Sequence, residues 1–371
     1  MNAGPIRRVV LQPTGFCNIN CAYCYLADRE TRTVMSADVV AATAHLLAGS
    51  GLVGDALEVR WHAGEPLTAP VAFYRDAHET FRQALGHRTR VWFSVQTNGI
   101  PITDEWCELF TADDVTVGVS IDGPPQLHDL HRRTRRGAPT HARVMRGVER
   151  LRRHGIPFDV ISVITRETLR NTGAYLRFLD ELAPRSVGLN PEESEGAHRS
   201  DLFSAETFRT DYRAFLTAMH AWQQRSGIPV RRLAAMRGHI LHGREAVRNE
   251  QTEPMAILSV DTAGNLSTFS PELLSWSDPA FDDYTFGNVL TPGVSLTSWS
   301  AGFRHLAEQI ARGRALCEAG CGYFRLCGGG SPSNKRAEHG TFVSAETNAC
   351  HLNTMAVVDV VLAALETEHA A

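Results

Sequence analysis

Eight cysteines occur in the chain, and seven of them fall into two short clusters. The first cluster lies in TGFCNINCAYCYL (residues 14–26), where Cys17, Cys21 and Cys24 are separated by three and then two residues. A disulfide takes two cysteines and a structural zinc site takes four ligands. Three thiolates can instead hold a metal centre and leave one coordination position open for chemistry, as catalytic metal sites do.

Two metal centres fit three thiolates at this spacing. A four-iron cluster normally takes four thiolates, so three would leave one iron open. The amino and carboxylate groups of S-adenosylmethionine could chelate that iron, and one electron would then release a 5′-deoxyadenosyl radical, chemistry that belongs to the cofactor. The alternative is a zinc ion completed by a distant histidine or cysteine, although zinc-binding pairs usually read C-x2-C or C-x4-C.

The second cluster lies near the C-terminus, with three cysteines in CEAGCGYFRLCGGG and a fourth in ETNACHLN. Its members are Cys317, Cys321, Cys327 and Cys350. Four thiolates can close the coordination of a zinc ion or of an auxiliary iron–sulfur cluster, and the spacing alone allows both. The eighth cysteine, Cys107 in DEWCELF, is expected to be a small buried side chain on a helix.

Short β-rich runs alternate with amphipathic helical patterns through the first two thirds of the chain. The six candidate strands are residues 7–13, 56–63, 89–97, 115–122, 157–165 and 185–190. Strands that alternate with helices predict a parallel sheet covered by helices. We therefore expect an α/β fold whose sheet curls into a partial (β/α)6 barrel of the TIM type, with ligands at the carboxyl ends of its strands. Helix starts are predicted at Ser36 and Thr103, and helix ends at Gly49 and Gly155.

The pattern changes after about residue 226. A basic helical segment is followed by a hairpin-like stretch, MAILSVDTAGNLSTF (255–269), and then by the region rich in cysteine and glycine. A chain of 371 residues is long enough for more than one hydrophobic core. We therefore predict two domains, residues 1–226 and residues 227–371.

Composition and charge exclude several classes of function. The formal net charge of −4 gives no reason to expect a nucleic acid or an anionic membrane surface as partner. The N-terminus has two arginines but no apolar run behind them, so it is no signal peptide. The longest apolar stretch, MAVVDVVLAALE (355–366), is short and contains Asp359, which predicts a packed helix and no membrane span. A cytoplasmic location is expected, where cysteines stay reduced.

Several motifs in order along the chain give a resemblance to a known family. The C-x3-C-x2-C loop, with Tyr23 before its third cysteine, resembles that of the radical S-adenosylmethionine (SAM) superfamily. HAGEP (62–66) resembles the Gly-Gly-Glu-Pro element of the family, whose backbone binds the methionine amino group, with Ala63 in place of the first glycine. The further matching motifs are QTNG (96–99), SIDGP (120–124) and HDLHRRTRRG (128–137).

The resemblance implies a SAM site built largely at strand ends. Ser120 and Asp122 are implied to lie near the ribose. Arg132, with Arg133 as the second choice, is implied to bind the methionine carboxylate. The implied cofactor-binding residues are Tyr23, Ala63, Gly64, Glu65, Asn98, Ser120, Asp122, Arg132 and Arg133. The implied ligands of the first four-iron cluster are Cys17, Cys21 and Cys24.

The second cysteine cluster resembles the SPASM/Twitch-type extension of radical SAM enzymes that act on peptides. The full extension carries seven cysteines and two auxiliary clusters. Here GNLSTFSPELL (264–274) lacks the cysteine expected after the hairpin, and Ser331 stands where a cysteine is expected four residues after Cys327. Both losses affect the same cluster, so the resemblance implies one auxiliary four-iron cluster, held by the four cysteines of the second cluster.

FSPELL (269–274) and the segment from Cys327 to Cys350 resemble maturases that form cyclophane crosslinks in ribosomally made (RiPP) peptides. The implied reaction removes a side-chain β-hydrogen and joins that carbon to an aromatic ring. The implied partners are the precursor peptide and an external electron donor such as flavodoxin or ferredoxin. Glu272 and Asp261 are candidate catalytic bases, although either can equally be a surface acid or a turn former. Three aromatic side chains can line a substrate pocket or belong to the core: Trp61, Trp92 and Phe93.

Other radical reactions on peptides remain as alternatives, namely formylglycine formation, thioether crosslinking and epimerisation. Sulfatase maturases, which make formylglycine, usually keep the full set of seven cysteines. From another class, the chain can be a non-catalytic zinc or iron–sulfur binding module. No leader-binding domain precedes the first strand, so we expect the core, the C-terminal region or a separate partner to recognise the precursor.

Overall fold

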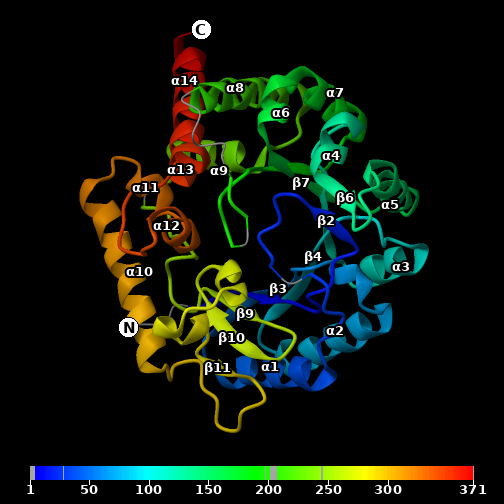
Figure 1. Cartoon of the computed structure of the whole chain (residues 1–371), viewed down its shortest axis with the longest axis vertical. Helices are drawn as coiled ribbons and strands as arrows, with labels where there is room; N and C mark the ends of the chain where they lie inside the picture. Colours follow the sequence, from blue (N-terminus) through cyan, green and yellow to red (C-terminus); the bar gives the residue numbers. More distant parts are fainter. Residues whose placement is uncertain (1–4, 28, 197, 201–206, 244, 371) are drawn as a thin grey trace.

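The computed structural model describes residues 5–27, 29–196, 198–200, 207–243 and 245–370. Its centre is a nine-stranded sheet with the order β11-β10-β9-β1-β3-β4-β5-β7-β8 (Figure 1). The six predicted strands are all present, and each pairs in parallel with the next. They are β1 (Ile6–Leu11), β3 (Val53–Trp61), β4 (Arg90–Thr97), β5 (Thr116–Ser120), β7 (Phe158–Ile164) and β8 (Ser186–Pro191). The predicted α/β fold with a six-stranded parallel core is confirmed.

Helices join successive parallel strands and surround the sheet, as Figure 1 shows. They are α1 (Ala37–Gly49), α2 (Val71–Leu85), α3 (Asp104–Ala112), α4 (Pro125–His131), α5 (His141–Arg153), α6 (Arg166–Arg170) and α7 (Thr172–Leu182). The side chains of Ser36 and Thr103 cap α1 and α3 by accepting a backbone N–H bond, as predicted. α1 ends at Gly49, and Gly155 follows α5 with a φ of +67°.

The hydrophobic core lies between the sheet and these helices. Trp61 and Phe93 are fully buried in it, where Trp61 Nε1 donates to His78 Nε2 at 3.0 Å and the Phe93 ring stacks on His78 at 3.7 Å. Both aromatics therefore belong to the core and not to a substrate pocket. Trp92 points to the other face of β4 and is half-buried. Cys107 is fully buried on α3, as expected.

The C-terminal part of the chain adds strands to the same sheet. β9 (Ile257–Val260) pairs in parallel with β1, and β10 (Asn265–Thr268) and β11 (Gly287–Asn288) continue the edge in antiparallel order. The hairpin-like stretch is thus confirmed as β9 and β10. α8 (Phe208–Ser226) and α9 (Arg231–His242) precede it. The predicted division at residue 226 coincides with the end of α8 and stays a prediction, because the sheet runs through both halves.

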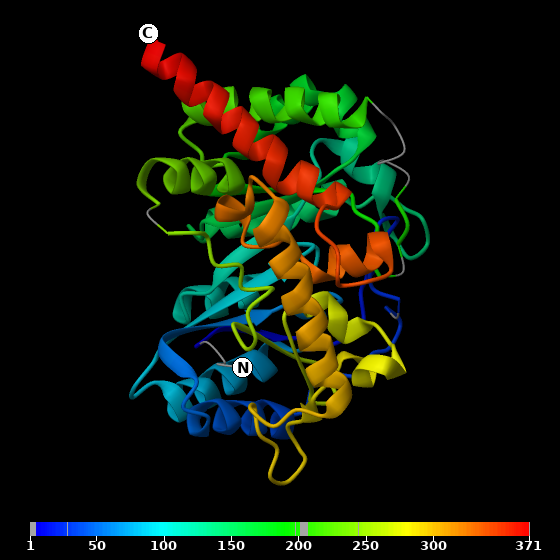
Figure 2. The ribbon, with the colours of Figure 1, turned by 90° about the vertical axis from the view of Figure 1, so that its left-hand side faces the viewer.

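The C-terminal helices pack beside the sheet edge. α10 (Ala301–Gly320) and α14 (Ala356–Ala370) are the two long helices facing the viewer in Figure 2, coloured orange and red. Between them lie α11 (Phe324–Cys327), α12 (Pro332–His339), α13 (Asn348–Cys350) and the π-helical turn His351–Met355. The short 3-10 helices are η1 (Pro66–Thr68), η3 (Pro271–Ser275) and η4 (Pro279–Tyr284).

The helical run Asn348–Ala370 is the one described segment that is long and apolar enough to cross a membrane. Of the most apolar stretch of this run, 18 residues long, 56% is buried inside the protein. Core helices pass the same test of length and composition, so this is weak evidence for a span. α14 packs against α8 and α9, as a C-terminal packed helix does.

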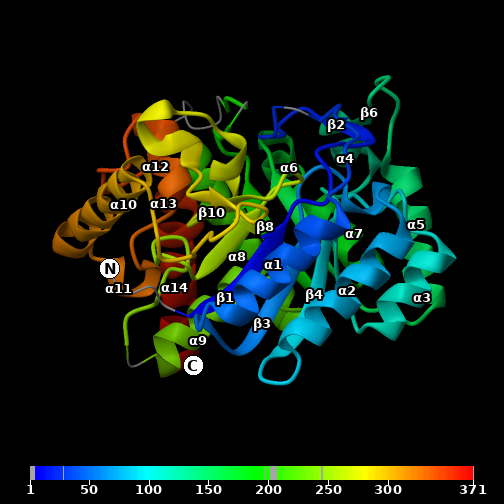
Figure 3. The same cartoon turned by 90° about the horizontal axis from the view of Figure 1, so that it is seen from below.

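A separate two-stranded ribbon carries part of the first cysteine cluster. β2 (Ile19–Cys21) and β6 (Arg132–Thr134) form this ribbon. In Figure 3 the ribbon and α12 both lie toward the upper side of the molecule. The first cysteine loop, which follows β1, and the helix next to the second cysteine cluster therefore share one side of the fold.

Candidate active site

The ribbon clamps the first cysteine loop to the arginine-rich segment. β2 pairs antiparallel with β6, and Cys21 lies directly opposite Arg132. The Ala22 N–H donates to the His131 carbonyl oxygen at 2.9 Å and extends this pairing. Cys21 and Arg132 are 111 positions apart in the chain. The fold therefore brings together two motifs that the sequence could only name separately.

The three thiols of the first loop lie in a partly closed environment. Cys17 is buried, and Cys21 and Cys24 are half-buried. Asn98 Nδ2 lies 4.0 Å from Cys17 Sγ, and Arg132 Nη1 lies 3.9 Å from Cys21 Sγ. Burial raises the pKa of Cys17 to about 12 and that of Cys21 to about 11. Because thiolates are the metal-binding form, metal binding here must release protons.

Arg132 is buried and paired with Asp122. Its Nε lies 2.9 Å and its Nη2 3.1 Å from the two carboxylate oxygens of Asp122. Tyr23 Oη and the Val163 N–H donate to the same carboxylate. Burial alone would raise the pKa of Asp122, but the charge and hydrogen bonds of Arg132 hold it below its ordinary value. Arg133 is exposed and donates to a nearby backbone carbonyl, so Arg132 is the arginine placed at the site.

Glu65 is buried at the end of β3 and accepts hydrogen bonds on both carboxylate oxygens. Thr97 Oγ1 and the Leu67 N–H donate to Oε1 at 2.6 and 3.0 Å. The Asn98 N–H donates to Oε2 at 2.7 Å. Burial outweighs these bonds and raises the pKa of Glu65 to about 7. The HAGEP and QTNG motifs are thereby joined through one carboxylate.

The turn before Glu65 packs tightly against the cysteine loop. Gly64 has a φ of +58°, and a Cβ there would lie 2.6 Å from the carbonyl oxygens of Phe16 and Thr14. Only glycine fits this approach. Ala63 takes a φ of +74° in spite of its Cβ, a conformation that costs about 1 kcal/mol or more. This cost is a physical reason for glycine at both positions in the Gly-Gly-Glu-Pro element of the family.

Among the polar residues near the site, Asn18, His62 and Gln96 were not singled out from the sequence. Gln96 Nε2 donates to Ser120 Oγ at 2.9 Å, and Asn98 Nδ2 donates to Asn18 Oδ1 at 2.6 Å. His62 directly follows β3. Its pKa is lowered to about 4, mainly by burial and to a smaller extent by the charge of Arg60. Its place as the first residue of the HAGEP motif is the signal that could have identified it.

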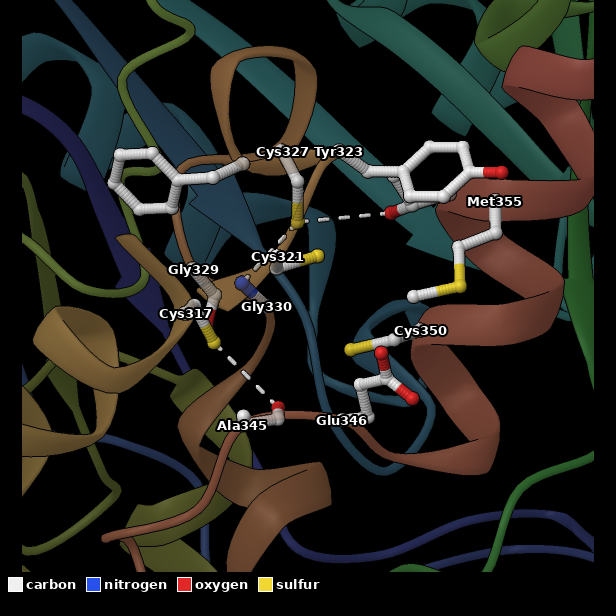
Figure 4. Close-up of a pocket in the computed structure, with 12 residues that line it drawn as sticks. Cys317, Cys321, Tyr323, Cys327, Gly329, Gly330, Ala345, Glu346, Cys350 and Met355 are labelled. Atoms are coloured by element: carbon white, nitrogen blue, oxygen red, sulfur yellow. Dashed lines mark hydrogen bonds between the residues drawn. The ribbon is translucent and has the colours of Figure 1, made fainter. Parts of the chain in front are cut away.

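The four cysteines of the second cluster line one pocket. Figure 4 shows their sulfurs directed into a common space, with Tyr323 and Met355 at its edge. Four sulfurs directed into one pocket are of the type and number that an iron–sulfur cluster takes.

Hydrogen-bond donors from nearby loops point at the sulfurs of Cys327 and Cys350. The Gly330 N–H donates to Cys327 Sγ at 3.2 Å, and Thr347 Oγ1 lies 3.2 Å from Cys350 Sγ. Gly328, Gly329 and Gly330 have φ values of +73°, +114° and +70°. A Cβ at residue 330 would lie 3.1 Å from Cys350 Sγ. The glycine turn therefore allows the backbone to approach the cysteines closely, which is a cluster-binding arrangement.

Ser331, where a cysteine is expected, contacts the segment that lacks the other expected cysteine. Ser331 lies 3.4 Å from Ser270, measured between the hydroxyl oxygens, and 2.8 Å from Ser333 Oγ. Ser270 belongs to the segment in which the other absent cysteine is expected. Hydroxyl groups thus form a hydrogen-bonded chain between Ser331 and the segment 264–274.

Asp261 is used by its own turn. Its Oδ1 accepts the N–H groups of Ala263 and Asn265, each at 2.9 Å, and its Oδ2 accepts Asn265 Nδ2 at 2.8 Å. The residue ends β9 and begins the link to β10. Of the roles considered for Asp261 (catalytic base, surface acid and turn former), the role of turn former matches these contacts.

Glu272 stands in a different environment, on η3. Its Oε2 is buried without a hydrogen-bond partner among the described residues. Burial raises its pKa, and the pKa of Glu195 is raised well above its ordinary value by burial and then by repulsion from Glu272. The charge of Glu272 also raises the pKa of Tyr25, which is next to Cys24 in the chain. Glu272 and Glu195 therefore lie together beside the first cysteine loop.

The sequence reasoning missed Glu193 and Glu195. Both follow the end of β8 in PEESEG, and this cluster of acids at a strand end is the signal that could have found them. Glu193 accepts from Asn334 Nδ2 at 2.6 Å, and also from Asn353. These two bonds connect the strand end to the helices around the second cysteine pocket.

Comparison with known proteins agrees with this geometry. The Radical SAM superfamily matches residues 11–179, which contain the first cysteine loop and the Asp122–Arg132 pair. The uncharacterized protein sll1766 of Synechocystis sp. is 38% identical over 374 residues, covering 98% of this chain and 93% of that protein. The serine-type anaerobic sulfatase-maturating enzyme of Bacteroides thetaiotaomicron is 35% identical over 163 residues, 42% of this chain and 39% of that enzyme. The similarity to that enzyme thus covers less than half of either protein.

Two solved structures share the fold. Native anSMEcpe with bound AdoMet has a TM-score of 0.78 at 18% identity and covers 97% of this chain and 98% of its own. SuiB of Streptococcus suis, bound to its precursor peptide SuiA, has a TM-score of 0.62 at 14% identity and covers 94% of this chain and 76% of its own. Family match, fold and site agree, and the chain belongs to the radical SAM superfamily of enzymes.

Proposed function

We propose that the chain is a radical SAM peptide maturase that forms cyclophane crosslinks in a ribosomal precursor peptide. The placement of Glu272 carries the proposal. Burial raises the pKa of its carboxylate, and its charge in turn raises the pKa of Tyr25 in the first cysteine loop. Along the chain, Glu272 lies two residues from Ser270 of the serine chain. That chain reaches Ser331, which directly follows the glycine turn of the second cysteine pocket. A proton acceptor between two cysteine sites is what a ring-forming radical reaction requires.

The first site fits SAM and a four-iron cluster in the type and placement of its residues. Cys17, Cys21 and Cys24 would hold the cluster, and Arg132 would meet the methionine carboxylate. The turn at Glu65 would receive the amino group. When bound, the cluster and SAM supply a 5′-deoxyadenosyl radical, chemistry that belongs to the cofactor. Tyr23 donates to Asp122, which pairs with Arg132, and Ser120 and Asp122 would lie near the ribose. Asn98 would lie beside Cys17.

The protein's part in the reaction is to position the peptide and to move one proton. After a β-hydrogen has left, the peptide radical adds to a neighbouring aromatic ring. The ring regains aromaticity when one electron and one proton leave it. Glu272 would take the proton in its ionised form, and its raised pKa makes it a stronger base. The electron would pass to the second cysteine site, whose four thiolates fit an auxiliary four-iron cluster.

Formylglycine formation is the second candidate, and the named sulfatase-maturating relatives favour it. Two observations count against it. The similarity to the Bacteroides enzyme covers 39% of that enzyme, whereas the similarity to the Synechocystis protein covers 93% of that protein. In addition, Ser331 stands where the family resemblance expects a cysteine, and sulfatase maturases usually keep the full set of seven.

Product analysis separates these reactions. The purified chain, reconstituted anaerobically, would be incubated with SAM and a candidate precursor peptide that contains an aromatic residue. A cyclophane removes two hydrogens per ring and blocks backbone fragmentation between the joined residues. Deuterium at the attacked β-carbon should move into 5′-deoxyadenosine. A product that fragments normally and reacts with hydrazides carries an aldehyde and would refute cyclophane formation, but not radical chemistry.

The electron donor is proposed to be an acidic protein such as a flavodoxin or ferredoxin in the cytoplasm. Arginines surround the first cysteine loop on its exposed side. Arg135 donates to the carbonyl oxygen of Cys17 at 3.3 Å, and Arg32 stacks over Phe16 at 3.9 Å. Arg133 and Arg136 are exposed beside them. A cationic rim next to a cluster attracts an acidic donor and speeds its association.

A further inference from the structure

The chain contains a single lysine, and it is buried beside the second cysteine site. Of the 37 lysines and arginines in the sequence, only Lys335 is a lysine. Its side chain is 3% exposed, although lysine is almost never fully buried without a partner. Its Nζ lies 2.9 Å from the Gly313 carbonyl oxygen and 3.3 Å from Cys317 Sγ.

The surrounding backbone is shaped to admit this side chain. At Gly313 on α10, an added Cβ would lie 2.0 Å from the Phe342 carbonyl oxygen and 3.4 Å from Lys335 Nζ. At Gly330, an added Cβ would lie 3.8 Å from Lys335 Cε. Larger residues at either position would crowd the space between α10 and the glycine turn. The amine is thereby held against Cys317.

A buried ammonium needs an anion close by, because its transfer out of water costs several kcal/mol. The described contacts of Lys335 include no carboxylate; they are a carbonyl oxygen and the Cys317 sulfur. The other polar neighbours of Cys317 Sγ are the carbonyl oxygens of Gly329 at 3.6 Å and Ala345 at 3.5 Å, the latter drawn in Figure 4. Carbonyl oxygens would repel a thiolate. Lys335 is therefore the described group that can stabilise a negative charge on Cys317.

We propose that Lys335 is a positioning residue that raises the reduction potential of the auxiliary iron–sulfur cluster held by the four cysteines of this site. The inference rests on the proposed function, because it requires that cluster. Reduction adds one negative charge to the site, and a cation hydrogen-bonded to a ligand sulfur favours the reduced form. The site thus becomes a better acceptor for the single electron that leaves the peptide radical.

Lysine suits this position better than arginine. Its ammonium is a compact point charge that fits between one carbonyl oxygen and one sulfur, whereas a guanidinium is planar and carries five donors. All the other residues counted among the lysines and arginines of the chain are arginines. The single lysine occurs where a small buried cation is needed.

The test measures the potential of the second cluster in the absence of peptide. Full-length protein with Cys17, Cys21 and Cys24 replaced by alanine keeps only the second site, and its reduced fraction is followed by electron paramagnetic resonance during a redox titration. Lys335→Met should lower the ratio of reduced to oxidised cluster at a fixed potential by about tenfold or more, about 59 mV for one electron. Lys335→Arg keeps the charge but fits the space less well, so its ratio of reduced to oxidised cluster should fall less than that of Lys335→Met.

Every outcome decides the proposal. If Lys335→Met keeps its iron and the reduction potential of the cluster is unchanged, the proposal is overturned. If Lys335→Met assembles no cluster while Lys335→Arg does, the charge is needed for assembly, which supports the charge role. If neither variant assembles a cluster although both fold by circular dichroism, the lysine acts only in packing and the proposal fails. A parent protein without a second cluster would instead refute the cluster assignment itself, before any Lys335 variant is compared.

Discussion

Ser270 and Ser331 lie 61 positions apart in the chain, and their hydroxyl oxygens lie 3.4 Å apart in the fold. Ser331 occupies a position where a cysteine is expected from the family resemblance, and Ser270 lies in the segment that lacks the other one. By the family resemblance, a second auxiliary cluster would need thiolates from both of these segments. Serine oxygens are poor ligands for an iron–sulfur cluster, which is held by thiolates. The contact therefore argues for one auxiliary cluster.

The iron content tests this conclusion. After anaerobic reconstitution the wild-type protein should hold about eight irons, from two four-iron clusters. Cys317→Ala or Cys350→Ala should lose roughly half of that iron, because each removes one of four thiolates from the second pocket. Ser331→Ala is the matched control and should change nothing. A wild-type content of about twelve irons would contradict the assignment, and a protein that binds zinc instead would refute the iron–sulfur interpretation.

The first cysteine loop gives the second prediction. Cys17→Ala, Cys21→Ala or Cys24→Ala should each abolish the reductive cleavage of SAM, because a cluster with two thiolates is released. The readout is 5′-deoxyadenosine formed with dithionite. Cys107→Ala removes a fully buried thiol far from either cluster motif, so it should lower stability by about 1 kcal/mol and leave cleavage intact. Wild-type cleavage from all three loop variants would refute the radical mechanism.

The sequence predicted the parallel core well, because each strand and helix carries its own local pattern. The caps at Ser36 and Thr103 follow from local hydrogen bonding in the same way. The parallel pairing of β9 with β1 could not be predicted, because the two segments are about 250 positions apart and no local sequence pattern marks their contact.

The site was predictable to a different degree. The cysteines are fixed by their spacing, and their grouping into two sets held in the fold. The roles of Asp261 and Glu272 were open, because a carboxylate looks the same in a turn and in a pocket until its neighbours are known. The burial of Lys335 was not predicted at all. Burying a lysine contradicts its ordinary preference, and only tertiary packing reveals that it happens.

Glu65 should make the stability of the metal-free chain depend on pH. Burial raises its pKa to about 7, from an ordinary value of 4.5. Between these two pH values the folded chain keeps a proton that the unfolded chain releases. The stability linked to this proton is therefore fully present below about pH 4.5 and is lost as the pH rises through 7, by about 3 kcal/mol. Free energies of unfolding for wild type and Glu65→Gln should diverge over this window, and parallel pH profiles would contradict the shift.

The arginine rim predicts a dependence on the type of reductant. Arg133→Glu combined with Arg136→Glu reverses the charge of two exposed side chains next to the first cysteine loop. Cleavage of SAM driven by flavodoxin or ferredoxin should slow by about tenfold or more at low salt, and the defect should shrink as salt rises. Cleavage driven by dithionite, a small reductant that needs no docking surface, serves as the control and should not change. Equal rates with the protein donor would place the docking surface elsewhere.

Glu272 gives the last prediction, because it separates the radical step from the proton step. Glu272→Gln keeps the size of the side chain but removes the base, so crosslinked peptide should fall by 10²-fold or more. SAM cleavage should persist, since the residue belongs to neither cysteine set. Asp261→Asn is the control: it disturbs a hydrogen-bonded turn, should cost about 1 kcal/mol of stability, and should keep the product. Because burial raises the pKa of Glu272, product formation by the wild type should increase with pH until the carboxyl group is ionised. A Glu272→Gln enzyme with a normal yield would remove Glu272 from the mechanism and leave Glu195 as the carboxylate to test.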